Sequence, residues 1–152
     1  MAGRKLTFAT GEVDYEINGV AHVRFNPTDA AFTERLYNTF SDLDARQEEF
    51  QAEVEQIGTD GARMFAYATE RDKDMRGIID GLLGEGTADA LFPNMNCYAL
   101  ADGLPVWINL MFAIAEEIEA AYTEEQKKGD PRVEGYNKKY QAMLAKYKTK
   151  KR

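Results

Sequence analysis

Apolar and polar side chains alternate over the first 25 residues of the chain. Apolar residues stand at every second position and acids stand between several of them, which is typical of strands that bury one face. We therefore expect a small antiparallel sheet of about three strands within residues 5–25, with a two-residue turn at Thr10-Gly11. The apolar positions are Leu6, Phe8, Val13, Tyr15, Ile17, Ala21, Val23 and Phe25.

The second turn of this sheet follows from parity, because a shift of one residue in register moves every side chain to the other face. A two-residue loop at Asn18-Gly19 would place Val23 opposite Asp14, on the polar face. A three-residue loop that includes Val20 instead aligns Val23 with Tyr15. We expect the longer loop despite the Asn-Gly pair.

The apolar period changes to that of a helix after Phe25. Asn26 is a capping residue and Pro27 suits the first turn of a helix, so we expect the first helix to begin there. The expected helices span residues 27–57, 60–83 and 103–128, with one further helical turn over 87–92.

Capping residues mark the ends of the later helices. Asp60 can cap the second, which the glycine-rich stretch 81–86 should end, and Asp102 can cap the third. Residues 106–114 are apolar nearly all round, so the third helix should be central to the core.

Charge divides the chain at Pro131. The net charge is -7, but from residue 132 onward 8 basic and 1 acidic side chains give +7, which leaves -14 for residues 1–131. We predict an α+β fold: residues 1–131 form a single domain with the small sheet packed on a mainly helical body, and residues 132–152 form a basic amphipathic helix and tail.

The basic C-terminal segment carries an apolar stripe at helical spacing, made of Tyr136, Tyr140, Met143, Leu144 and Tyr147. Lysines interleaved with tyrosines also occur in nucleic-acid-binding segments. Here the tyrosines share one face and the lysines the others, which favours docking on protein over binding nucleic acid. Tyr136, Tyr140 and Tyr147 are therefore candidates for protein interaction, and we expect self-association through the acidic body.

The sequence offers no recognisable catalytic or metal-binding arrangement. His22 should face outward from its strand, and the single cysteine, Cys97, lies far along the chain in a loop. The stretch 81–86 follows a helix and lacks the Lys-Ser/Thr of a phosphate loop. We interpret acidic pairs such as Asp72 and Asp74 as solvated helix faces. We predict no catalytic residue, no cofactor and no metal ligand.

The segment 96–111 has the composition of a core or of a protein interface, since it is rich in large apolar side chains and poor in charge. We favour a core, and Trp107 is the one residue of this segment that we name as a candidate for protein interaction. The most apolar part, 104–115, is shorter than the roughly 20 residues of a membrane span, and no signal peptide is recognisable. We expect a cytoplasmic protein with no membrane partner.

Several phrases along nearly the whole chain resemble small proteins encoded in the tail-morphogenesis region of phages and prophages of Gram-positive bacteria. They are VRFNPTD at 23–29, RLYNTF at 35–40, LF at 91–92, ADGLPVW at 101–107 and EQKK at 125–128. In these phrases the sequence is similar to the tail assembly chaperones, although no functional site of that family can be assigned to individual residues of this sequence.

The resemblance implies a non-enzymatic function. Such a chaperone binds and solubilises the long tape measure protein in the host cytoplasm, acts in many copies, and leaves as the tail tube protein, a further candidate partner, polymerises. Two alternatives remain open. One is a structural tail or connector protein that stays in the virion, and the other is a nucleic-acid-binding regulator that uses the basic tail.

Overall fold

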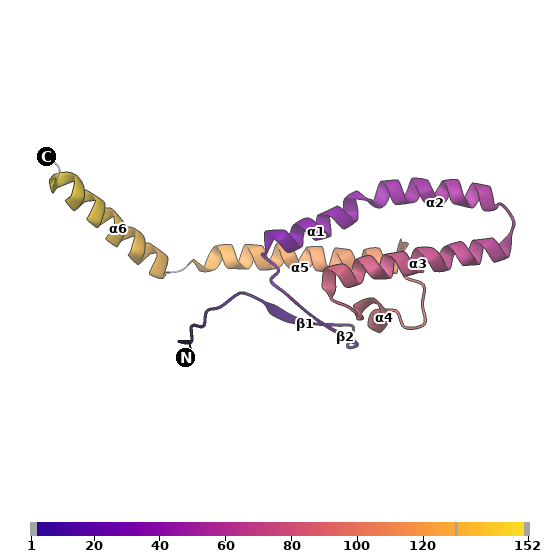
Figure 1. Ribbon diagram of the computed structural model, residues 1–152, viewed down its shortest axis with the longest axis horizontal. Coiled ribbons are helices and arrows are strands. Elements are labelled where there is room, and N and C mark those ends of the chain that lie inside the picture. Colours follow the sequence, from indigo (N-terminus) through magenta and orange to yellow (C-terminus); the bar gives the residue numbers. More distant parts are fainter. Residues whose placement is uncertain (1–2, 130, 151–152) are drawn as a thin grey trace.

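The computed structural model describes residues 3–129 and 131–150 of the chain. It is a mixed α+β structure that is mainly helical (Figure 1). The elements in chain order are β1 Val13–Ile17, β2 Ala21–Phe25, α1 Ala30–Ser41, α2 Leu43–Ile57, α3 Gly61–Leu83, α4 Thr87–Leu91, β3 Leu100–Ala101, β4 Leu104–Pro105, α5 Val106–Lys128 and α6 Pro131–Lys150.

The N-terminal hairpin has the register that parity predicts. Tyr15 pairs with Val23 and Val13 with Phe25, and a three-residue loop joins the two strands. Its first two residues, Asn18 and Gly19, take positive φ angles of 52° and 70°. The alternation of β2 is complete, because Ala21, Val23 and Phe25 are buried while the residues between them are exposed.

The prediction of a strand before this hairpin is wrong, since residues 3–12 form no strand. Leu6 and Phe8 are exposed. Gly11 has a φ of +73°, and the Asn26 side chain donates a hydrogen bond to the Thr10 carbonyl oxygen at 2.8 Å. Two apolar residues offer a third strand too little burial to offset the entropy of ordering its backbone.

The helix expected over 27–57 is divided into α1 and α2 at Asp42. Asp29, rather than Asn26, caps α1 by accepting a hydrogen bond from the Ala31 N–H at 3.0 Å. Asn26 instead accepts from the Thr28 N–H at 2.8 Å in a turn before the helix. At the division, the Ser41 hydroxyl donates to the Asn38 carbonyl oxygen, and such local bonds compete with helix continuation.

The third long helix begins later than expected. Asp102 does not cap it: Asp102 and Gly103 have φ angles of 55° and 82° and form the tight turn between β3 and β4. An Asp-Gly pair suits such a turn because both positions need positive φ. By contrast, the helix expected over 60–83 matches α3, whose cap is Asp60, and the expected turn over 87–92 matches α4.

The core lies where α1, α3, α5, β2 and α4 meet. α1 packs against α3 and α5, while β2 packs against α3 and α4 on the other side (Figure 1). Its largest fully buried side chains are Trp107, Phe32, Met75, Ile79, Met111 and Cys97. Helix α6 extends beyond the end of α5, away from this body. Among the described residues, no helix is both long and apolar enough to cross a membrane.

Arg76 on α3 fixes the irregular segment between α4 and β3. Its guanidinium donates to the carboxylates of Asp72 at 2.8 Å and Asp89 at 2.9 Å, and to the carbonyl oxygens of Ala88, Phe92 and Met95. These acceptors lie in α3, in α4 and in the segment after α4, so one largely buried side chain connects the three.

We predict that Arg76→Ala lowers the free energy of unfolding by about 3 kcal/mol, because it leaves the Asp72 carboxylate without its cation and removes the donor to the carbonyl oxygens of Phe92 and Met95. Urea unfolding followed by circular dichroism measures this. Lys73→Ala, at an exposed position on the same helix, is the control and should change stability little. Equal stability of the two variants would contradict the role given to Arg76.

Candidate functional site

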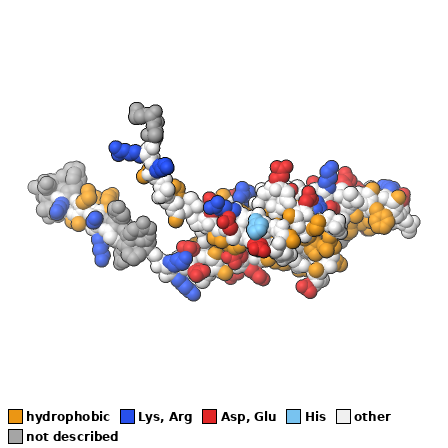
Figure 2. Space-filling view, turned by 90° about the horizontal axis from the view of Figure 1, so that it is seen from below, with side chains coloured by type: hydrophobic (Ala, Val, Ile, Leu, Met, Phe, Trp, Pro, Cys, Tyr) orange, Lys and Arg blue, Asp and Glu red, His pale blue; other side chains and the backbone are white. Residues whose placement is uncertain are grey.

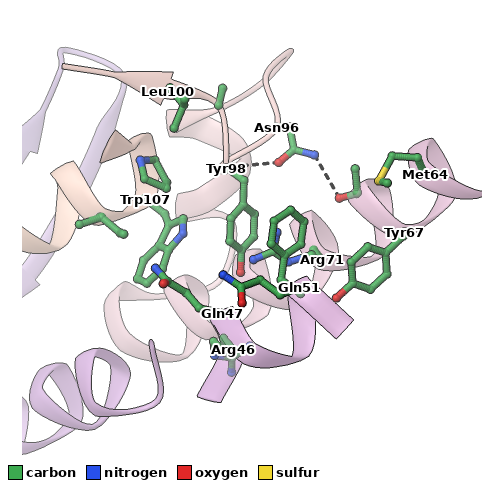
Figure 3. Close-up of a pocket in the computed structure, with 15 residues that line it drawn as sticks. Arg46, Gln47, Gln51, Met64, Tyr67, Arg71, Asn96, Tyr98, Leu100 and Trp107 are labelled. Carbon is green, nitrogen blue, oxygen red and sulfur yellow. Dashed lines mark hydrogen bonds between the residues drawn. The ribbon is translucent and has the colours of Figure 1, made fainter. Parts of the chain in front are cut away.

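A pocket of about 670 Å³ lies between the α2–α3 hairpin and the segment that leads into α5 (Figure 3). We call it the arginine pocket. Its walls come from α2, from α3, and from residues 96–108. It is lined by Arg46, Gln47, Phe50, Gln51, Met64, Tyr67, Ala68, Arg71, Asn96, Tyr98, Ala99, Leu100, Pro105, Trp107 and Ile108.

Arg71 is held between two aromatic rings in this pocket. Its guanidinium carbon lies 4.0 Å from the ring centroid of Phe50 and 3.9 Å from that of Tyr98. The Tyr67 ring, one turn earlier on α3, stacks on Phe50 with centroids 6.2 Å apart. Rings over a guanidinium attract it through their electron-rich faces and leave its N–H groups to point outward in the guanidinium plane. The arrangement fixes Arg71 while its hydrogen-bond donors stay usable.

A second cation, Arg46 of α2, lies at the same wall. Its guanidinium is 3.3 Å from the Asp74 carboxylate, which is largely exposed. This pair spans α2 and α3, and an exposed partner contributes little to stability. Arg46 and Arg71 together make the polar side of the pocket positive.

Trp107 lies at the opposite end of the pocket and is completely buried. Trp107 is the second residue of α5 and belongs to the core, the position that was favoured for its segment, and its contact with a partner protein stays a prediction. The indole meets the Tyr98 ring edge-on at 6.0 Å. Its Nε1–H finds no hydrogen-bond partner among the described residues, and Figure 3 shows that nitrogen on the side facing Tyr98. A buried donor without a partner is uncommon and calls for an explanation.

The third wall is positioned by hydrogen bonds that it donates to α3. Asn96 donates to the Ala68 carbonyl oxygen at 3.1 Å and accepts from the Tyr98 N–H at 2.9 Å (Figure 3). Asp72 accepts from the Cys97 N–H at 2.7 Å. The interpretation of Asp72 as a solvated residue is thus wrong: its side chain faces the 96–98 segment, while Asp74, two residues on, is exposed.

Burial and hydrogen bonds set the protonation of these groups. Burial alone would raise the pKa of Asp72, but the hydrogen bonds from Cys97 and Arg76 outweigh it and lower that pKa. Burial raises the pKa of Tyr98 against the opposing effect of Arg71 and Arg46. Burial, together with Asp72, raises the pKa of Cys97 to about 12. Near neutral pH the pocket therefore presents a neutral phenol and two cations, and Cys97 stays a thiol.

The residues predicted from sequence do not meet at this pocket, apart from Trp107. His22 is exposed on β2 and Cys97 is buried behind the pocket wall, both as expected. Tyr140 is exposed on α6. The side chains of Tyr136 and Tyr147 lie outside the described residues. Sequence reasoning missed the Arg71 cluster, whose one local signal is the spacing of four between Tyr67 and Arg71 on α3.

The arrangement suits binding more than bond-breaking. An apolar wall faces two guanidiniums, which together fit an apolar group that carries an acceptor or an anion. Among the described residues, no three His, Cys, Asp or Glu side chains gather closely enough to hold a metal ion. No protein-family model matches the chain, and comparisons with curated proteins and with solved structures find no match either.

We predict that Asp72→Asn lowers the free energy of unfolding at neutral pH. The difference from the unaltered protein should become smaller as the pH falls. The pKa of Asp72 is lowered in the folded state, so its contribution is complete above the ordinary value of 3.8 and is lost as the pH falls through the folded value. Urea unfolding at several pH values from neutral downward measures this. Glu70→Gln on the exposed face of α3 controls for the lost charge, and a deficit of constant size for D72N would contradict the prediction.

Proposed function

We propose that this protein is a non-enzymatic binding protein for an amphipathic helix, acting as a tail assembly chaperone that holds the phage tape measure protein in solution. The observation that supports this best is the arginine pocket, with its apolar wall and its two cations. The family resemblance supplies the partner, and the pocket supplies a surface of suitable chemistry.

The pocket suits the way helices dock in grooves. Such helices insert apolar side chains spaced by three or four residues and meet polar groups at the rim. Here the apolar positions would face Phe50, Met64 and Leu100, and an acidic side chain one turn away would reach the guanidinium of Arg71. Phe65 adds exposed apolar surface on α3, beside the pocket. Figure 2 shows hydrophobic side chains gathered at the end of the molecule where α2 and α3 lie.

The titratable groups support a binding function over an enzymatic one. The described residues that line the pocket include no serine, cysteine or histidine. The thiol of Cys97, with a pKa of about 12, would be a poor nucleophile near neutral pH. His22 is exposed on a strand outside the pocket. A helix-binding chaperone needs none of these groups to be activated.

We predict that co-expression with the tape measure protein raises the soluble fraction of that partner, and that Arg71→Glu reduces this gain because it places a negative charge opposite the acidic positions of the docking helix. Affinity for a synthetic tape measure helix, measured by isothermal titration calorimetry, should fall roughly tenfold or more.

Arg63→Glu, exposed near the start of the same helix, is the matched charge reversal and should bind like the unaltered protein. Circular dichroism verifies that both variants fold. If the unaltered protein leaves the tape measure protein insoluble, the chaperone function is wrong. If it solubilises the partner and R71E does so equally well, the helix docks elsewhere. Mature tail particles should lack the protein, and its presence there in fixed stoichiometry would favour a structural component.

A further inference from the structure

A second hollow lies between the start of α1 and the second half of α5, away from the arginine pocket. This α1–α5 groove measures about 630 Å³. Two tyrosines stand at its edges, Tyr37 with 68% and Tyr122 with 53% of its surface exposed. It is lined by Pro27, Thr28, Ala30, Thr33, Glu34, Tyr37, Ile118, Glu119, Tyr122 and Thr123. Apolar side chains form most of its surface, and the charges at its rim are the carboxylates of Glu34 and Glu119.

Helix α6 presents the complementary chemistry. Met143 and Leu144 lie three and four residues after Tyr140, so the three side chains share one face of the helix. Tyr140 is 63% and Met143 68% exposed. Lys139 and Lys146 fall beside this stripe, and Lys138 falls on the opposite side of the helix. The helix therefore offers an apolar stripe that is bordered by two cations on the side of Met143.

The charges of the whole chain are divided in the same way as those of the groove and α6. Residues from 132 onward carry +7, whereas residues 1–131 carry -14. An apolar stripe with flanking lysines can cover the groove while the ammonium groups reach Glu34 and Glu119 at its rim. The negative potential of residues 1–131 attracts α6 and repels the same residues of another copy. Electrostatic attraction between two copies therefore acts mainly through this helix.

We propose that α6 of one copy of this chain packs into the α1–α5 groove of a second copy. Tyr140, Met143 and Leu144 lie against Tyr37, Ile118 and Tyr122, with Lys139 and Lys146 near Glu34 and Glu119. In the structure α6 continues outward past the end of α5 and away from its own groove (Figure 1), which is the placement that reaches a neighbour. Two copies that exchange their helices satisfy both surfaces and form a closed dimer. This proposal does not rest on the proposed function.

Sedimentation velocity on the full chain tests the contact. The unaltered protein should sediment as a dimer or larger species that dissociates on dilution, and raising the salt concentration should weaken it because exposed charges are screened. Leu144→Asp in α6 and Tyr122→Glu in the groove should each weaken association by roughly tenfold or more. Tyr122 and Leu144 each lie in the C-terminal half of their helix and outside the core. Circular dichroism verifies that the variants fold. Lys138→Glu should associate almost as the unaltered protein does.

Mixing the two weakened variants separates exchange between copies from docking within one chain. L144D retains an intact groove and Y122E retains an intact α6, so the mixture should form a heterodimer through one good contact and associate more strongly than either variant alone. A protein that is monomeric at all concentrations, with α6 protected from proteolysis, would overturn the proposal in favour of docking within the chain. Association that L144D leaves unchanged, or that requires bound nucleic acid, would also overturn it.

Discussion

The ion pair between Asp72 and Arg76, one turn apart on α3, is the constraint on which much of this structure depends. Arg76 holds the carbonyl oxygens of the segment after α4, and Asp72 holds the Cys97 N–H at its end. The backbone of Cys97 in turn contacts α5, because the Cys97 carbonyl oxygen accepts a hydrogen bond from the Trp107 N–H at 3.1 Å. The first turn of α5 is thus satisfied by backbone that α3 has fixed.

This constraint also explains why a pocket is present. A segment without regular structure can form a stable wall only when its polar groups are satisfied, and here α3 satisfies them through Asp72, Arg76 and the Ala68 carbonyl oxygen. Tyr98 is then carried to a fixed place over Arg71, which Phe50 of α2 covers from the other side. The pocket therefore depends on α3 for its wall and on the α2–α3 hairpin for its aromatic contacts.

The sequence predicts regular elements well where a repeated pattern and a capping residue agree. The alternation of β2, the three-residue loop before it and the Asp60 cap of α3 are all of this kind. It fails where a local signal competes with tertiary contacts. Leu6 and Phe8 alternate correctly but gain no burial, and Asp102 is used in a turn rather than as a cap. The Arg71 cluster joins residues of two helices and a loop, and no periodicity relates positions 50, 71 and 98.

Trp107 gives the buried side of the pocket an additional property. It is the one tryptophan of the chain, and within the part of the chain that the structure describes its indole nitrogen has no hydrogen-bond partner. Because Trp107 is one of the residues that line the pocket, a ligand bound there changes the environment of a single chromophore and of a single indole proton. The chain therefore carries its own spectroscopic probe in the wall of the pocket, and its fluorescence and proton resonance report occupancy there without any label.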